Sequence, residues 1–192
     1  MKQIAGSVLD VTEGIIVQQV NCQGVMGAGL AKQIREKYPH VYENYRDVYE
    51  VAEGSLLGVV CYVHVSPKLC ISSVFGQEYY GRNKNIVYTN YNALKTGLAD
   101  ISSVAQALGY QVYIPHGIGC GLANGDWNVV LSIIEETTPD AIIVKWDGYE
   151  TKYLVGSGLY RTKEKAVAAR VQQGDVTPEL LIELAEWLKE EM

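Results

Sequence analysis

Short apolar runs alternate with amphipathic stretches along most of the chain. The short runs are rich in Val and Ile and predict buried strands, over residues 2–5, 14–20, 58–65, 69–74, 110–114 and 141–145. Apolar residues at helical spacing predict helices over residues 28–38, 40–51, 89–108 and 125–136. Pro39 and Gly109 mark helix ends, because proline cannot continue a helix and glycine readily adopts the left-handed conformation that closes one.

This order of elements predicts an α/β fold. Strands that are apolar at nearly every position are typical of a sheet buried on both faces. We therefore expect a largely parallel or mixed sheet covered by helices on both faces. Ligands in such folds bind outside the carboxyl ends of the strands, where loops lead into helices.

The pattern changes after Gly148, which predicts a domain over residues 1–148 and a C-terminal extension over residues 149–192. The extension begins with a glycine-punctuated loop or hairpin. It continues into two helices, the second of which opens with Thr177 as its N-cap. A stripe of leucines along this last helix predicts that it docks on the domain or on a partner.

Composition and charge narrow the class of protein. The chain has 192 residues, a net charge of -6 and a pI near 5.1, which disfavours binding to long nucleic acid because that needs a cationic face. No apolar run is long enough to cross a bilayer, and the N-terminus lacks a signal-peptide core. The cysteines form no C-x-x-C pair and the histidines do not cluster, so we expect a cytoplasmic protein with reduced thiols and no structural metal.

Two glycine-rich loops each lie between a predicted strand and a predicted helix. The first reads G24-V-M-G-A-G29 and the second H116-G-I-G-C-G-L-A-N-G-D-W127. Either loop alone would be explained by a plain turn. Because backbone amides at glycine-rich turns before helix N-termini bind anions, the pair predicts a site for a diphosphate. Neither loop matches the phosphate loop of NTPases or the dinucleotide fingerprint of dehydrogenases.

These loops resemble those of the macrodomain family, whose members bind ADP-ribose. The stretch N21-C-Q-G-V-M-G-A-G-L-A31 is similar to the family's first ligand loop, and I114-P-H-G-I-G-C-G-L-A-N-G-D-W127 to its second. Between them, S72-S-V-F-G-Q77 resembles the segment after a central strand, where an aromatic residue borders the ligand. The resemblance covers residues 1–147. The second loop most resembles a small branch that contains ADP-ribose-1''-phosphate phosphatases and terminal ADP-ribose hydrolases.

The resemblance implies a three-layer α/β/α fold that binds ADP-ribose or a derivative of it. Asn21 would hydrogen-bond a ribose hydroxyl, and Phe75 would pack on a ribose or adenine face. The ligand-binding residues that it implies are Asn21, Gln23, Gly24, Met26, Gly27, Ala28, Gly29, Phe75, Gly76, Gln77, Gly117, Ile118, Gly119, Cys120, Gly121 and Leu122.

The chain departs from the family's pattern at several positions. Ser7 stands where the family has an Asp that recognises the adenine amino group, and Gln18 where the phosphatases tend to have a histidine. Ala123 stands where the glutamate-specific hydrolase has an Asp, and Gln77 where that enzyme has a lysine, with Lys84 further along. These departures argue against the lysine-adduct mechanism of that hydrolase.

Two residues beside the second loop are candidates for catalysis. Asp126, at the start of a predicted helix, could orient or deprotonate an attacking water, although capping that helix would explain it equally well. His116 could act as an acid, a base or a phosphate ligand near neutral pH, or could be a structural histidine at a strand end. Cys22 and Cys120 flank the predicted pocket, and we interpret them as packing residues because the sequence shows no activating base beside either.

The sequence therefore favours a protein that binds ADP-ribose or a related nucleotide and hydrolyses a group from its distal ribose. That group would be a 1''-phosphate or an ester-linked adduct, and an ADP-ribosylated protein is a candidate partner. The reaction would need no metal ion or cofactor, and we expect no membrane partner. Two alternatives stay open: a non-catalytic reader or sponge for the nucleotide, and an interaction protein whose tail helices dock a partner.

Overall fold

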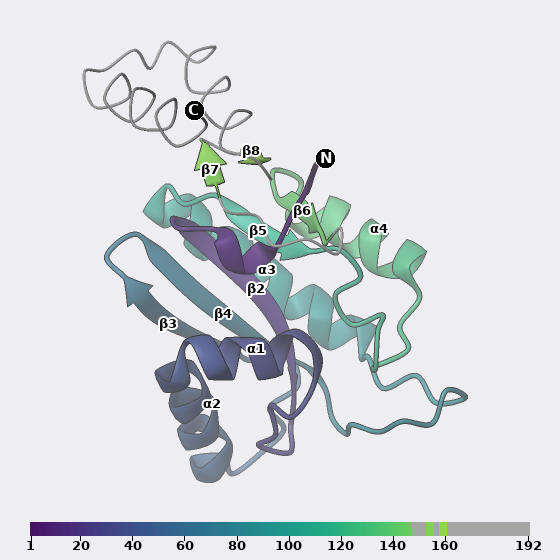
Figure 1. Ribbon diagram of the computed structural model, residues 1–192. Coiled ribbons are helices and arrows are strands. Elements are labelled where there is room, and N and C mark those ends of the chain that lie inside the picture. The colour runs from purple at the N-terminus through teal and green to yellow at the C-terminus, as the bar shows by residue number, and fades with distance from the viewer. Residues whose placement is uncertain (147–152, 156–157, 161–192) are drawn as a thin grey trace, which may run out of the picture.

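A computed structural model of the chain describes residues 1–146 and the strands at 153–155 and 158–160 (Figure 1). Along the chain the main elements are β1 (Lys2–Ala5), η1 (Val8–Asp10), β2 (Gly14–Asn21), α1 (Gly29–Lys37), α2 (Pro39–Val51), β3 (Val60–Ser66), β4 (Leu69–Gln77), α3 (Tyr91–Leu108), β5 (Val112–Pro115), α4 (Trp127–Thr137) and β6 (Ile142–Lys145). Each strand and helix predicted for residues 1–146 has a counterpart in this order.

Six strands form one sheet in the order β1-β6-β5-β2-β4-β3. All neighbouring strands are parallel except β3 and β4, which form an antiparallel pair. After β2 the chain runs to the edge strand β3 and returns through β4 beside β2, and it later continues on the other side of β2 through β5 and β6. The carboxyl ends of β2 and β5 therefore flank the point where the strand order reverses, which is where open α/β sheets bind ligands.

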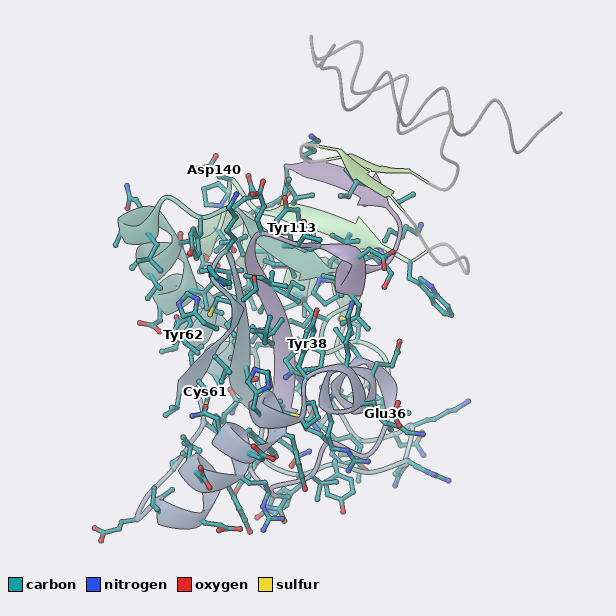
Figure 2. All side chains as sticks on the ribbon, turned by 60° about the vertical axis from the view of Figure 1, so that its left-hand side comes forward. Glu36, Tyr38, Cys61, Tyr62, Tyr113 and Asp140 are labelled. Atoms are coloured by element: carbon teal, nitrogen blue, oxygen red, sulfur yellow. The ribbon has the colours of Figure 1, made fainter. Side chains whose placement is uncertain are left out.

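Helices cover both faces of the sheet, with α1 and α2 on one side and α3 and α4 on the other (Figure 1). Successive side chains of β2 point to opposite faces of the sheet. Ile15 belongs to the apolar cluster beneath α3 and α4, and Ile16 to the cluster beneath α1 and α2. Figure 2 shows Tyr62 and Tyr38 on opposite sides of the sheet, and each packs against the corresponding cluster. The predicted α/β fold with helices on both faces is confirmed.

Most strands differ from the predicted ones by one to three residues at their ends, and β4 extends to Gln77. Capping side chains account for the start of α3 and for η1. The third helix begins at Tyr91 and not at 89, because the Asn90 side chain accepts a hydrogen bond from the Ala93 amide. The short 3-10 turn η1 was not predicted. Ser7 caps it by accepting from the Leu9 amide at 3.2 Å, which gives a structural role to one of the departures from the macrodomain pattern.

The C-terminal extension is described only in part. Strands β7 (Tyr153–Val155) and β8 (Gly158–Tyr160) pair as a separate two-stranded antiparallel sheet, within the stretch where a loop or hairpin is expected. The two helices predicted for the extension, the second of which opens with Thr177, lie outside the described residues. Within the described part of the chain, no helix is long and apolar enough to cross a membrane.

Candidate functional site

A cavity of about 460 Å³ opens at the carboxyl ends of β5, β2 and β4. This volume is typical of sites that bind small molecules. It lies where the reversal of strand order favours a ligand, between the two glycine-rich loops. The predicted site residues that line it are Asn21, Gly27, Ala28, Gly29, Gln77, His116, Gly117, Ile118, Gly119, Gly121 and Leu122.

Asn21, the last residue of β2, organises the first glycine loop. Its Oδ1 accepts hydrogen bonds from the amides of Gln23 and Val25 and from the Tyr45 hydroxyl, at 2.9, 3.3 and 2.9 Å. Its Nδ2 donates to the Val25 carbonyl at 2.6 Å. An amide nitrogen carries two hydrogens, so one N–H of this cavity-lining side chain is left for a ligand.

The N-terminus of α1 opens into the same cavity. Ala28 is the N-cap residue and supplies no side-chain hydrogen bond to the first turn. The first amide of this helix with a helical acceptor is that of Lys32, which donates to the Ala28 carbonyl. Uncapped first-turn amides at the positive end of a helix dipole form an anion site. Glycine on both sides of Ala28 lets an anion approach these amides closely.

The second glycine loop presents further amides to the cavity. Gly117 and Gly119 have φ angles of 76° and 71°, a conformation that glycine adopts without strain. Turn hydrogen bonds within the loop use the amides of Ile118 and Cys120. The amides of Gly117, Gly119 and Gly121 donate to no acceptor among the residues that the structure describes. Two sets of free N–H donors therefore belong to the wall of one cavity.

Several predicted ligand residues do not line the cavity, namely Gln23, Gly24, Met26, Phe75, Gly76 and Cys120. Phe75 is fully buried, and its ring centroid lies 5.3 Å from that of Tyr45. Met26 belongs to the same apolar cluster. In this structure Phe75 is therefore a core residue, which differs from the expected contact with a ribose or adenine face.

The two glycines outside the cavity wall are explained by packing. A Cβ on Gly24 would lie 2.8 Å from the Tyr49 ring, and a Cβ on Gly76 would lie 2.8 Å from the Gln19 side chain. Neither position can hold a larger residue without displacing a neighbour. Both glycines thus serve the close approach of other elements.

Asp126 caps helix α4 and lies outside the cavity wall. Its carboxylate accepts a hydrogen bond from the Asn128 amide at 2.8 Å, and its own amide donates to the Tyr91 hydroxyl at 2.8 Å. The capping interpretation of this residue therefore has direct geometric support. No carboxylate belongs to the cavity wall among the residues that the structure describes.

His116 does line the cavity, directly after β5. Its ring packs against Trp127 with a centroid separation of 4.4 Å. Burial lowers the pKa of His116 below its usual value, and the nearby charge of Lys145 lowers it further. The imidazole is therefore largely neutral near pH 7 and can accept a proton or a hydrogen bond.

The two cysteines near the cavity have protonated thiols. Burial, assisted by the charge of Glu78, raises the pKa of Cys22 to about 11, and burial with the charge of Asp126 raises that of Cys120 to about 11. A thiol nucleophile needs a lowered pKa. The interpretation of these cysteines as packing residues fits this environment.

The remaining residues of the wall were not predicted to bind the ligand, and Gln18 and Ala123 were noted only as departures from the macrodomain pattern. These residues are Gln18, Gln19, Val20, Val25, Leu30, Ala31, Tyr80, Gly81, Arg82, Pro115 and Ala123. Gln18 and Gln19 carried a signal, because two polar residues interrupt an otherwise apolar strand. The apolar members and the loop residues around Arg82 carried none, since their positions depend on how distant segments meet.

Comparisons with known proteins support the fold. A protein of unknown function from Bacteroides thetaiotaomicron is 29% identical with a TM-score of 0.68, over 76% of this chain and 98% of that chain. A macrodomain protein from Streptomyces coelicolor is 22% identical with a TM-score of 0.62, over 76% and 97%. Thermosipho africanus DarTG, solved in complex with ADP-ribose, is 18% identical with a TM-score of 0.57, over 71% of this chain and 38% of that chain. No protein-family model and no curated protein matches the chain.

The chain has the macrodomain fold. The resemblance inferred from the two glycine loops is thus confirmed at the level of the fold.

Proposed function

We propose that this protein binds ADP-ribose or a derivative of it in the cavity at the carboxyl ends of β5, β2 and β4. The proposal rests on two groups of free backbone N–H donors in the cavity wall. One group is at the uncapped start of α1, and the other belongs to the glycines of the second loop. A diphosphate between them would accept from both. The free Nδ2 hydrogen of Asn21 would hold a ribose hydroxyl.

Two further observations support this ligand class. The described cavity wall has no carboxylate that would repel a diphosphate. The Thermosipho africanus structure, which shares the fold, contains ADP-ribose. A nucleoside diphosphate joined to a second ribose is also long enough to reach across the ends of several strands.

Calorimetric titration tests this proposal. We expect the chain to bind ADP-ribose, and to bind AMP and ribose 5-phosphate each at least tenfold more weakly, because each half lacks part of the diphosphate. Gly27→Glu, which places a carboxylate in the cavity wall, should weaken ADP-ribose binding at least tenfold. Gly54→Glu, at an exposed site with open space around it, adds the same charge elsewhere and should not. No binding of ADP-ribose by the unmodified chain would overturn the proposal.

A second function, hydrolysis at the distal ribose, has one observation in its favour: the neutral His116 lies in the cavity wall and can act as a general base. Release of phosphate from ADP-ribose-1''-phosphate, and of ADP-ribose from a modified glutamyl peptide, would be measured together. Turnover that falls at least a hundredfold in His116→Gln, with ADP-ribose affinity retained, would support hydrolysis. Binding without turnover would make the protein a reader or sponge.

A further inference from the structure

The 78–88 loop, which joins β4 to α3, forms one side of the cavity through Tyr80, Gly81 and Arg82. The two ends of the loop are held together by a β-bridge between Gln77 and Thr89. A loop closed at its base in this way can present side chains in fixed positions.

The second glycine loop holds the 78–88 loop in place. The Asn124 Nδ2 donates to the carbonyls of Asn83 and Ile86, at 2.9 and 2.7 Å. The Ala123 carbonyl accepts from the amides of Tyr88 and Thr89, at 2.8 and 3.2 Å. The loop is thus tied along its length to the same segment that presents the glycine amides.

Asn124 has an unusual backbone conformation. Its φ angle of 54° makes it the one non-glycine residue with positive φ in the described part of the chain. Asparagine tolerates this left-handed conformation better than most residues. The combination of backbone and side chain directs the amide group at two carbonyls of the neighbouring loop.

Arg82 is the only fully charged side chain among the described residues of the cavity wall. It is exposed, and no described residue forms a hydrogen bond or ion pair with its guanidinium. Arg46, in contrast, is paired with Glu50 on its own helix. A guanidinium without a protein partner is free to bind an anionic group of a ligand, for which its planar set of donors is well suited.

The position of Arg82 indicates which part of a ligand it would meet. Asn21 lies opposite Gln77 in the register of β2 and β4, and the Cys22 amide donates to the Gln77 carbonyl at 3.0 Å. The 78–88 loop therefore starts beside Asn21, where the ribose is proposed to bind. His116 follows β5, on the other side of β2.

We propose that Arg82 forms a second anion subsite, which selects ADP-ribose derivatives that carry a phosphate monoester on the ribose held by Asn21. Asn124 is the positioning residue that keeps Arg82 over the cavity. This inference rests on the proposed binding of ADP-ribose, because the two amide sets are assigned to the diphosphate and leave the guanidinium for a third anionic group.

Dissociation constants for ADP-ribose and ADP-ribose-1''-phosphate test the subsite, with free phosphate assayed in the same samples. Where phosphate is released, kcat/KM for that release replaces the dissociation constant. We expect Arg82→Gln to weaken the phosphorylated ligand roughly tenfold or more while changing ADP-ribose less than about threefold. Lys84→Gln is the matched control, since Lys84 is an exposed cation of the same loop but does not line the cavity.

Asn124→Gly tests the positioning role, because glycine keeps the left-handed backbone while removing both side-chain donors. It should reduce the preference for the phosphorylated ligand as Arg82→Gln does, and the double variant should show no further reduction. A merely destabilised fold would weaken both ligands alike and leave the preference unchanged.

The outcomes separate this inference from the proposed function. If the unmodified chain binds ADP-ribose and Arg82→Gln weakens both ligands equally, or neither, the subsite does not exist. If Arg82→Gln acts as expected and Asn124→Gly does not, the positioning role is wrong. Absence of ADP-ribose binding by the unmodified chain would overturn both the proposed function and the subsite.

Discussion

Asp126 follows the second glycine loop in the sequence, and in the structure its side chain caps α4. Its position therefore supports the capping role over the catalytic one. Its carboxylate is used by the Asn128 amide, and it does not belong to the cavity wall. At the residue scale, the contact of the Asp126 carboxylate thus supports a structural role for this residue.

A pair of substitutions tests this assignment. Asp126→Ala should lower the free energy of unfolding by about 1 kcal/mol, because the α4 cap is lost, while Asp126→Asn should lower it by much less, since Asn also caps helices. Urea unfolding measures both values. We expect ADP-ribose affinity and any turnover to be unchanged in both variants. Loss of turnover in Asp126→Asn at unchanged stability would instead show that the carboxylate acts on the ligand.

His116 gives a prediction for the pH dependence of stability. Its pKa is lowered in the folded chain from the usual value of 6.5, so the unfolded chain binds the proton more readily as the pH falls. This residue therefore contributes to a loss of stability as the pH falls below about 7, and not above that pH. His116→Gln should make the stability curve shallower there, as measured by urea unfolding at a series of pH values. An unchanged slope would contradict the lowered pKa.

Individual side chains were the least predictable part of the site. The glycine loops revealed Gly27, Gly29, Gly117 and Gly119, because two glycine-rich stretches at strand ends together predict an anion site. Arg82 carried no signal. Its place in the cavity wall depends on contacts between the 78–88 loop and a segment that follows much later in the chain.

At the scale of elements, α1 gives up a capping interaction where it meets the cavity. Most helices gain stability from Ser, Thr, Asp or Asn at the N-cap, and Ala28 supplies no such side chain. The amides of the first turn are therefore left free for an anion. A substitution at Ala28 that caps the helix should therefore raise the stability of the fold and lower the affinity for the ligand.

Ala28→Asp tests that opposition. The side chain is exposed and the backbone is extended, so an aspartate can cap the helix and should stabilise the fold by about 1 kcal/mol. The same carboxylate would occupy and repel the ligand site, so ADP-ribose should bind at least tenfold more weakly. Thermal unfolding and calorimetry measure the two effects, with Ala28→Asn as the uncharged capping control. A variant that is more stable and binds equally well would contradict the assignment of these amides.

The elements themselves were predicted well because their signals are local. Runs such as residues 141–145 are apolar at almost every position, and Gly109 ends α3 in the left-handed conformation expected of it, with φ of 67°. Two of the differences arise from caps: Asn90 delays the start of α3, and Ser7 caps the turn η1. Such side-chain hydrogen bonds shift a boundary without changing the periodic pattern.

At the scale of the whole molecule, the order of the strands assembles the site. Alternating strands and helices predicted the α/β class, but not that β2 would lie between β5 and β4. Pairing of distant strands has no local signature in a single sequence. The resemblance of the two loops to macrodomains implied a three-layer α/β/α fold, and the structure adds the order of the strands.

The proposed diphosphate site lies between the start of α1 and the second glycine loop, and its occupancy can be measured directly. The most direct measurement is the change in backbone amide NMR shifts on adding ADP-ribose. The largest changes should fall on Gly27, Gly29, Gly117, Gly119 and Gly121. A second hollow lies at the opposite ends of the strands and is lined by residues of η1 and the end of α1. Shift changes centred on that hollow, or no changes at all, would contradict the proposed site.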